Sequence, residues 1–343
     1  MATSREVDAM RRAIVLALSP GVPPGPNPRV GCVLLAPDGS VIAEGHHRGA
    51  GTDHAEVDAL RRAGDRARGA TAVVTLEPCN HTGRTPPCSE ALLAAGVQRV
   101  VYAQADPHAI AAGGAHRLGH AGIDIEAGVL ADEASALNEA WTFAVTVGRP
   151  MITWKVAATL DGRICASDGT SRWISGERSR LQVHELRAEV GAIVIGTGTA
   201  LADDPQLTAR TPGGALAAWQ PLRVVVGLRD LPAGSRVLDD SAPSEHLRTH
   251  DPVEVVDALQ AREVRHVLLE GGPTLAAAFL VAGLVDRVIW YVAPVILGAG
   301  LPAVADLGIG TIGSALRLSE VRVEQVGEDA RIMGVVARAN DSD

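Results

Sequence analysis

Short apolar runs alternate with helical segments along this chain, and this alternation constrains the fold more than any other feature. In the first half the pattern predicts strands at residues 30–35, 41–44, 72–76, 99–103 and 123–126. The expected helices lie around and between them, at residues 7–18, 54–63 (with Asp53 as the N-cap), 89–95 and 132–147. Because strands that alternate with helices form a sheet covered by helices, we predict an α/β fold.

The run Gly148-Arg149-Pro150 interrupts the alternation and marks the expected domain boundary. Beyond it we expect helices over 178–189 and after Thr274, and strands at 152–157, 192–195, 222–226, 266–269, 288–292, 316–324 and 332–337. A length of 343 residues is enough for about two domains. We therefore predict one domain over residues 1–147 and a second over residues 150–343.

The composition excludes several classes of protein. Hydrophobic residues make up 47% and charged residues 21%, which supports a packed core and rules out wholesale disorder. The formal net charge of −9 argues against a broad nucleic-acid surface, and nine aromatic residues are too few to favour a base-stacking platform. We therefore expect a small-molecule partner and no nucleic acid, with any anionic ligand bound in a local basic pocket.

The sequence also limits the expected location of the chain. Residues 1–18 interleave charged and apolar residues, unlike a signal peptide. The best candidate for a membrane span, residues 280–297, is interrupted by Asp286 and Arg287. The four cysteines are too few for a disulfide scaffold: Cys32, Cys79, Cys88 and Cys165. We expect a reducing cytoplasm and no membrane.

Two cysteines and one histidine form a candidate metal centre. His54 begins an expected helix, Cys79 follows an expected strand, and Cys88 lies just before another helix. One imidazole and two thiolates are three of the four ligands of tetrahedral zinc, which leaves a place for water. Zinc brings the pKa of that water to about 7 and so supplies hydroxide. Glu56 is two residues from His54, too close to be a routine ligand, and is better placed to move protons.

The order His-x-Glu followed by Pro-Cys and a second Cys is typical of zinc deaminases. In this chain eight residues separate Cys79 from Cys88, where the deaminase pattern has two. A structural zinc with four closed ligands, or buried unpaired cysteines, would explain the same residues. Cys32 and Cys165 have no such neighbours and are expected in the core.

Three motifs resemble the bifunctional deaminase–reductases of riboflavin biosynthesis: Pro26-Asn27-Pro28-Arg29-Val30-Gly31, His54-Ala55-Glu56, and residues 75–79 with Pro87-Cys88. The resemblance covers nearly the whole chain. It implies a cytidine-deaminase-like three-layer α/β/α domain that deaminates 2,5-diamino-6-(5-phosphoribosylamino)pyrimidin-4-one. The zinc ligands would be His54, Cys79 and Cys88, and Glu56 the general acid and base. Asn27 would contact the pyrimidine, although an Asn between two prolines also often caps a turn.

In the second half, residues 270–275 (Glu-Gly-Gly-Pro-Thr-Leu) join a strand to a helix, where free N–H groups attract phosphate. Alone, this run is also an ordinary turn. Residues 155–162, 169–174 and 199–210 resemble the reductase half of the same family, which has a dihydrofolate-reductase-like α/β fold and uses NADPH. The resemblance places around the cofactor Ala157, Trp173, Thr199, Asp203, Gly272, Pro273, Thr274, Leu275, Ala276, Ala277 and Ala278. It places around the substrate Lys155, Ser171, Arg187, Leu207, Arg210 and Glu270.

The expected reductase chemistry leaves one choice open. Arg187 and Arg210 are suitable partners for a sugar phosphate, because a guanidinium is always charged and binds phosphate with two hydrogen bonds. Hydride transfer to C1′ of the ribosylamine, in its open imine form, also needs a proton. Lys155 or Asp203 could assist, and the sequence does not choose between them.

Two regions depart from the family. Residues 108–115 lack the basic residue that relatives carry between two glycines, and Gly227-Leu228 replaces an Asp followed by a small polar residue. The first change concerns a deaminase substrate contact and the second a cofactor contact. The sequence does not report whether either change weakens binding.

The prediction is therefore a bifunctional riboflavin-biosynthesis enzyme that contains zinc and uses NADPH. The alternative is a nucleic-acid-editing zinc deaminase fused to a nucleotide-binding module, which the charge and the aromatic content disfavour. A non-catalytic zinc scaffold is a third interpretation. The resemblance also suggests a homodimer or homotetramer.

Overall fold

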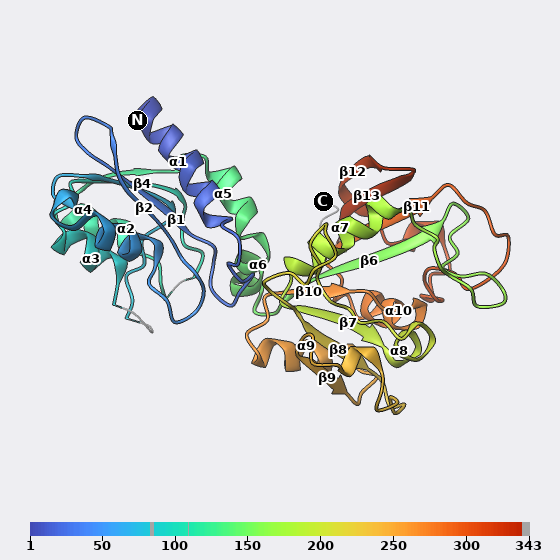
Figure 1. The fold of residues 1–343 in the computed structure, drawn as a ribbon. Helices are drawn as coiled ribbons and strands as arrows, with labels where there is room; N and C mark the ends of the chain where they lie inside the picture. The colour runs from blue at the N-terminus through green and yellow to red at the C-terminus, as the bar shows by residue number, and fades with distance from the viewer. Residues whose placement is uncertain (83–85, 109, 338–343) are drawn as a thin grey trace. The chain divides into compact units, whose positions relative to one another are not determined.

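The structure is a computed structural model that describes residues 1–82, 86–108 and 110–337. The chain divides into two compact units, Met1–Gly148 (unit 1) and Arg149–Asp343 (unit 2) (Figure 1). Within the described residues, unit 1 contains a five-stranded sheet and unit 2 an eight-stranded sheet. No helix in this part of the chain has the length and apolar character needed to cross a bilayer.

The sheet of unit 1 has the strand order β2-β1-β3-β4-β5. Its strands are β1 (Gly31–Leu35), β2 (Val41–His46), β3 (Thr71–Leu76), β4 (Arg99–Gln104) and β5 (Asp124–Ala127). Strand β1 runs antiparallel to β2 and β3, whereas β3, β4 and β5 are parallel. The helical elements are α1 (Ser4–Ala17), α2 (Ala55–Ala63), η1 (Gly64–Ala67), α3 (Cys88–Ala94), α4 (Gly114–His120), α5 (Ala131–Leu137) and α6 (Glu139–Val147).

Helices cover both faces of this sheet, because successive residues of a strand point to opposite sides. Cys32 and Leu34 of β1 pack in one cluster with residues of α2, α3 and α4. Val33 and Leu35 pack in another cluster with residues of α1 and α5. Unit 1 is therefore a three-layer α/β/α domain, and the expected fold is confirmed.

Two details of unit 1 differ from the sequence prediction. The N-cap of α2 is His54, because it is the residue with extended backbone before the first helical turn, so the assignment to Asp53 was wrong. The single helix expected over 132–147 is two helices that meet at Asn138. The Asn138 side chain accepts the N–H of Arg29 at 2.7 Å and donates to the Arg29 carbonyl at 2.9 Å. These contacts hold Asn138 in a non-helical conformation.

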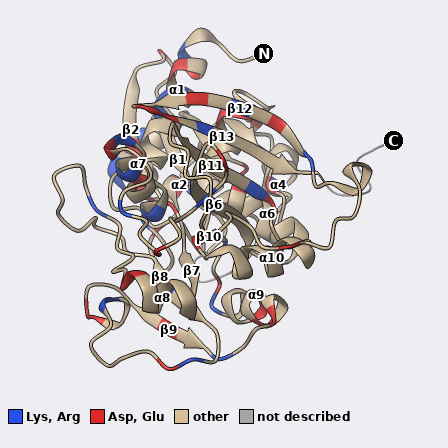
Figure 2. Ribbon diagram, turned by 90° about the vertical axis from the view of Figure 1, so that its right-hand side faces the viewer, with Lys and Arg blue, Asp and Glu red and all other residues tan. Residues whose placement is uncertain are grey.

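The sheet of unit 2 has the order β12-β13-β11-β6-β10-β7-β8-β9. Six neighbouring strands from β11 to β9 are parallel, and β13 and β12 add an antiparallel pair at one edge. The bounds are β6 (Met151–Thr159), β7 (Ala192–Gly196), β8 (Leu222–Val226), β9 (Ser244–Leu247), β10 (His266–Leu269), β11 (Arg287–Ala293), β12 (Leu318–Val326) and β13 (Asp329–Val336). Acidic and basic residues alternate along β12 (Figure 2).

The helical elements of unit 2 are α7 (Glu177–Ala188), α8 (Thr197–Asp203), η2 (Arg236–Leu238), α9 (Pro252–Ala261), α10 (Pro273–Val281) and η3 (Ile312–Ser314). One core cluster contains Val255 of α9 and Phe279 of α10, packed with residues of β6 and β10. A second contains Ala200 of α8 with residues of β7 and β8. The sequence pattern did not predict β9 or the three helices α4, α8 and α9.

Candidate active sites

The three predicted metal ligands come together in unit 1. His54 caps α2, Cys88 is the first residue of α3, and Cys79 lies in the loop after β3. The Nδ1 of His54 is 3.1 Å from the Sγ of Cys88 and 3.6 Å from the Sγ of Cys79. A tetrahedral zinc site separates nitrogen and sulfur ligands by about 3.5 Å. The donor set and these distances fit one zinc ion, and the three residues are called the metal cluster below.

Close packing sets the position of the metal cluster. A Cβ at Gly45 in β2 would lie 2.4 Å from the carbonyl oxygen of Ala55, so glycine lets α2 approach the sheet. The backbone N–H of Cys88 donates to the Sγ of Cys79 at 3.4 Å, and that of Ser89 donates to the Cys79 carbonyl at 3.2 Å. The first turn of α3 therefore holds Cys79 in place.

The two thiols have different proton affinities. The hydrogen bond with Cys88 is the main cause that lowers the pKa of Cys79 to about 4. The same hydrogen bond, followed by burial, raises the pKa of Cys88 well above its ordinary value. This contact favours the thiolate form of Cys79, which is the form that binds a metal.

Glu56, the predicted proton carrier, lies beside the metal cluster in the first turn of α2. Its side chain is buried, and burial raises the pKa of its carboxyl group, which also interacts with the thiol of Cys88. A carboxyl group with a raised pKa is suited to taking up and releasing a proton near neutral pH.

Asn27 is linked to the metal cluster through His47, which sequence reasoning had missed. The buried His47 ring meets the His54 ring edge-on, with centroids 5.3 Å apart. Its Nδ1 is 3.0 Å from the carbonyl of Asp53, and its Nε2 is 3.0 Å from the Nδ2 of Asn27. Because a carbonyl only accepts, the ring proton lies on Nδ1, and Nε2 accepts from Asn27. The adjacent histidines at the end of β2 were the available sequence signal.

Glu77 is a second residue that the sequence analysis had missed. This buried carboxylate follows β3 and accepts three backbone N–H groups at 3.1–3.2 Å, from Asp106, Gly113 and Ala115. A Cβ at Gly114 would lie 1.7 Å from the carbonyl oxygen of Pro78, so this loop packs directly against the segment that carries Cys79. Glu77 therefore ties a distant loop to the metal cluster. An acidic residue between Leu76 and a proline was its only local signal.

In unit 2, three predicted substrate residues form one buried charge cluster. Glu270 follows β10 and accepts from the Nε and Nη2 of Arg187 at 2.7 and 3.0 Å. It also pairs with the Nζ of Lys155 at 3.0 Å. Burial alone would raise the pKa of Glu270, but the charges of Arg187 and Lys155 hold it well below its usual range. Two cations against one carboxylate leave a net positive charge, which suits an anionic ligand.

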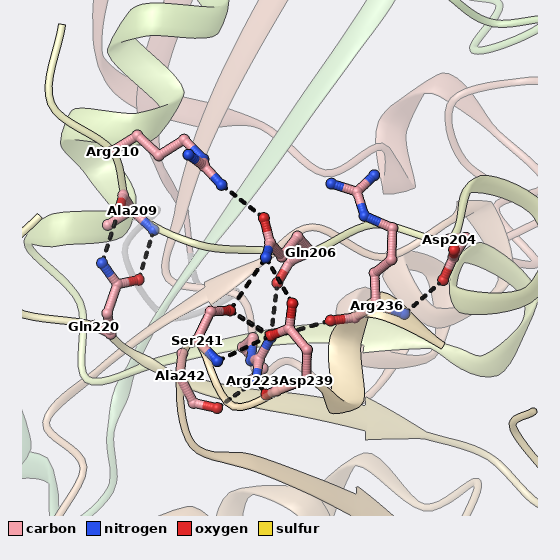
Figure 3. Close-up of polar contacts among 10 residues, drawn as sticks. All are labelled: Asp204, Gln206, Ala209, Arg210, Gln220, Arg223, Arg236, Asp239, Ser241 and Ala242. Atoms are coloured by element: carbon pink, nitrogen blue, oxygen red, sulfur yellow. Dashed lines mark hydrogen bonds and ion pairs between the residues drawn. The ribbon is translucent and has the colours of Figure 1, made fainter. Parts of the chain in front are cut away.

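Two further predicted substrate residues, Leu207 and Arg210, lie in the segment 206–210. Leu207 is buried and has a left-handed backbone with φ of 56°. The Nη1 of Arg187 donates to the Thr208 carbonyl at 3.3 Å, which brings the segment to the charge cluster. Arg210 donates to two neutral oxygens, and Figure 3 shows one of these contacts.

The strand-to-helix turn predicted to bind phosphate starts α10. Gly272 is the N-cap, and its N–H donates to the Oγ1 of Thr199 in α8 at 3.2 Å. None of the described side chains caps this helix, so the amides of its first turn, at Thr274 and Leu275, can meet an anion. The first turn begins with Pro273. Further along, Ala276 and Ala277 are buried and Ala278 is partly buried.

Trp173 and Asp203 are brought together through Arg172. Trp173 is 70% exposed, and the guanidinium of Arg180 lies 4.7 Å from its ring centroid. Arg172 lies 6.0 Å from the same ring and donates to the carbonyl of Asp203 at 2.5 Å. This arrangement presents an aromatic surface near the end of α8.

The remaining two predicted residues, Ala157 and Ser171, are placed by their backbone contacts. Ala157 lies two residues after Lys155 in β6 and pairs with Tyr291 of β11. Ser171 lies in a loop, where its carbonyl accepts the N–H of Ile174 at 3.1 Å.

Comparison with known proteins assigns both units. The family model described as the cytidine and deoxycytidylate deaminase zinc-binding region matches residues 3–104, and that of the RibD C-terminal domain matches residues 150–332. The riboflavin biosynthesis protein RibD of Mycobacterium tuberculosis is 53% identical over 315 residues, which cover 91% of this chain and 92% of that protein. The chain belongs to the RibD family.

Other RibD proteins agree with this assignment. RibD of Escherichia coli is 39% identical and covers 93% of this chain and 96% of its own length. The structure of Acinetobacter baumannii RibD has a TM-score of 0.87 and 37% identity, and covers 97% of this chain and 99% of its own. The structure of a diaminohydroxyphosphoribosylaminopyrimidine deaminase/5-amino-6-(5-phosphoribosylamino)uracil reductase from Thermotoga maritima has a TM-score of 0.84 and 32% identity, with the same coverage.

Membership in the RibD family confirms the resemblance seen in the sequence, and with it the two-part α/β fold. The deaminase zinc-binding region includes all three residues of the metal cluster. The comparisons give no support to a nucleic-acid-editing deaminase.

The structure shows why glycine suits position 227, one of the two positions where the sequence was expected to depart from the family. Gly227 follows β8 with φ of 133°, and a Cβ there would lie 2.6 Å from the Oγ1 of Thr197. Its carbonyl accepts from the Nε2 of His246 at 2.8 Å. A side chain at this position would have a strained backbone and would collide with the side chain of Thr197, the first residue of α8.

Proposed function

We propose that this chain catalyses two consecutive steps of riboflavin biosynthesis. Residues 1–147 deaminate 2,5-diamino-6-(5-phosphoribosylamino)pyrimidin-4-one. Residues 150–343 then reduce the ribosyl group of 5-amino-6-(5-phosphoribosylamino)uracil to ribityl with NADPH. The observation that carries the proposal is the metal cluster with the buried carboxyl of Glu56 beside it, in a chain that belongs to the RibD family.

In the first step, His54, Cys79 and Cys88 would hold a zinc ion that would activate a water molecule. Zinc, when bound, lowers the pKa of that water to about 7. Glu56 takes a proton from the attacking water and passes it to the leaving amine, which departs as ammonia. Asn27, oriented by His47, contacts the pyrimidine ring.

In the second step, the substrate lies at the charge cluster of unit 2. Arg187 and Arg210 bind its phosphate, and Leu207, Ser171 and Glu270 complete its surroundings. Of the two cations that pair with Glu270, Lys155 alone can release a proton, because a guanidinium does not deprotonate in proteins. We therefore propose Lys155, rather than Asp203 of the proposed cofactor site, as the donor of the proton that accompanies reduction at C1′.

NADPH supplies the hydride when bound. The uncapped first turn of α10 supports a phosphate site for this cofactor, and Gly272 permits close approach of the backbone there. Thr199, which contacts Gly272, lies beside this turn. Trp173, Asp203 and Ala157 line the rest of the proposed cofactor site, together with the α10 residues Pro273, Thr274, Leu275, Ala276, Ala277 and Ala278.

The test separates the two steps. Ammonia release and NADPH oxidation are measured on the wild-type chain and on Glu56→Ala and Asp203→Ala variants. We expect Glu56→Ala to lose at least 100-fold in deamination while still reducing supplied 5-amino-6-(5-phosphoribosylamino)uracil. Asp203→Ala should show the opposite pattern. Deamination at the wild-type rate in Glu56→Ala would remove the role assigned to Glu56.

Two further parts of the proposal concern the setting of the enzyme. We infer a reducing, cytoplasmic location, because oxidation would remove the thiolates of Cys79 and Cys88 that the first step needs. We also expect a homodimer or homotetramer. Light scattering coupled to size-exclusion chromatography measures the mass directly, and a monomer at micromolar concentration would contradict this expectation.

A further inference from the structure

A polar network connects Arg210 with the interior of unit 2 (Figure 3). Its fixed point is Arg223, a fully buried side chain in β8. The Nη1 of Arg223 donates to the Oδ1 of Asp239 at 2.8 Å and to the backbone carbonyl of Gln206 at 3.1 Å. Its Nη2 donates to the carbonyls of Asp239 and Ala242. A buried guanidinium with this many partners resists displacement.

The side chain of Gln206 extends the network to Arg210. Its Nε2 donates to the Oδ2 of Asp239 at 2.6 Å and to the Oγ of Ser241 at 3.3 Å. Its Oε1 accepts from the Nη2 of Arg210 at 2.7 Å. A carboxylate only accepts and a guanidinium only donates, so the Gln206 amide can satisfy both neighbours in one orientation only. Hydrogen bonds from Ser241 and Gln206 hold the pKa of Asp239 below its usual range, so this orientation persists at neutral pH.

The contacts of Arg210 leave its charge uncompensated. Its second partner is the carbonyl oxygen of Gly214, at 2.7 Å. In the part of the chain that the structure describes, no carboxylate forms an ion pair with Arg210. Arg187, in contrast, is paired with Glu270 through two hydrogen bonds. Much of the positive charge offered to a phosphate therefore comes from Arg210, which neutral oxygens orient without neutralising.

We propose that Gln206 is a positioning residue for the reductase reaction. It fixes the guanidinium of Arg210 for the substrate phosphate and anchors it to the buried Arg223–Asp239 pair, while leaving the charge of Arg210 available. This inference rests on the proposed function, in which Arg210 binds that phosphate. Preorganised charge binds an anion more tightly than a side chain that must be ordered on binding.

Two substitutions test the role. Gln206→Met removes all three side-chain hydrogen bonds at similar volume, and Gln206→Glu keeps the shape but adds a negative charge next to Asp239 and Arg210. We expect Gln206→Met to raise KM for the phosphorylated substrate by roughly 10-fold, equivalent to about 1.4 kcal/mol, with kcat within about 2-fold. Gln206→Glu should raise KM further, because its carboxylate neutralises Arg210. The inhibition constant of inorganic phosphate should rise in the same order.

Gln220→Met is the matched control. Gln220 holds the same segment through two hydrogen bonds with the backbone of Ala209, at 2.8 and 2.9 Å. Among the described residues, the hydrogen bonds of Arg210 go to Gly214 and Gln206 and not to Gln220. We expect it to change the inhibition constant of phosphate by less than about 3-fold. Deaminase activity, measured on each variant, reports that unit 1 has folded, and kcat of NADPH oxidation at saturating substrate reports that unit 2 has folded. For a substrate without phosphate, Gln206→Met should behave as wild type.

A double-mutant cycle with Arg210→Gln gives the decisive comparison. If Gln206 acts through Arg210, Gln206→Met has no further effect on KM once Arg210 is replaced. Wild-type KM in Gln206→Met, equal effects on substrates with and without phosphate, or fully additive effects in the cycle would each overturn the inference while leaving the proposed function intact. A wild-type chain that does not reduce the uracil compound would refute the proposed function itself, and with it this role.

Discussion

The charge cluster of unit 2 makes a quantitative prediction for Glu270→Gln. Glu270 is 6% exposed, and its partners Lys155 and Arg187 are each 14% exposed, so solvent screens these ion pairs little. Replacing the carboxylate by an amide leaves two nearly buried cations without their counter-charge. Breaking a buried pair from one side costs about 3–5 kcal/mol. Because glutamine still accepts a hydrogen bond, we expect the lower end, about 3 kcal/mol.

This loss converts to a change in melting temperature. For a unit the size of unit 2, the entropy of unfolding is roughly 0.4 kcal/mol/K, so about 3 kcal/mol lowers Tm by about 7 °C. Differential scanning calorimetry of the full chain measures the shift. The control is Glu324→Gln, which removes the pair between Arg331 and a 48% exposed carboxylate and should shift Tm by less than about 2 °C.

The same pair predicts a dependence on pH. The pKa of Glu270 in the folded chain lies below its ordinary value of 4.5. The contribution of its ion pairs to the free energy of unfolding is therefore complete above pH 4.5 and declines as the pH falls below 4.5. The difference in Tm between wild type and Glu270→Gln should therefore be constant near neutral pH and narrow below 4.5. A shift under 1 °C at pH 7, or a difference that grows in acid, would refute the reasoning.

Two other substitutions test the packing of unit 1. Gly114→Ala places a Cβ 1.7 Å from the carbonyl oxygen of Pro78, so the segment carrying Cys79 must move. We expect ammonia release to be at least 10-fold slower and NADPH oxidation to be unchanged. Ammonia release at the wild-type rate would contradict this contact. Asn138→Ala leaves the N–H and carbonyl of Arg29 without this side-chain partner. It should lower the free energy of unfolding of unit 1 by about 1–3 kcal/mol, measured by chemical denaturation. A change under about 0.5 kcal/mol would show that Asn138 does not hold the segment of Arg29 to the α5–α6 junction.

The metal cluster was predictable from the sequence because each ligand stands next to a local signal. His54, Cys79 and Cys88 lie at the starts of helices or the end of a strand, where apolar spacing and helix-start residues locate side chains to within a residue or two. Their convergence was inferred from the donor set and from the order of the motif, which is typical of zinc deaminases.

The residues that support the sites were not predictable in this way. His47 meets Asn27 across 20 positions, and Glu77 meets Ala115 across 38. Gln206 and Asp239 are 33 positions apart. Such contacts depend on tertiary packing, which cannot be predicted from hydrophobic periodicity or secondary-structure propensity. The arginine at position 223, inside an otherwise apolar strand, was the one visible anomaly.

The division of the helix at Asn138 illustrates the same limit. Residues 132–147 have a continuous helical pattern, and a single Asn within it is weak evidence for a break. The break depends on the backbone of Arg29, 109 residues earlier in the chain, which the side chain of Asn138 bonds twice.

Metal content measured together with first-step turnover tests the central claim most directly. Stripping the purified chain with a chelator should abolish ammonia release from the diaminopyrimidine substrate, leave reduction of the supplied uracil compound unchanged, and be reversed by about one equivalent of zinc per chain. Full ammonia release by metal-free protein would contradict the role given to His54, Cys79 and Cys88.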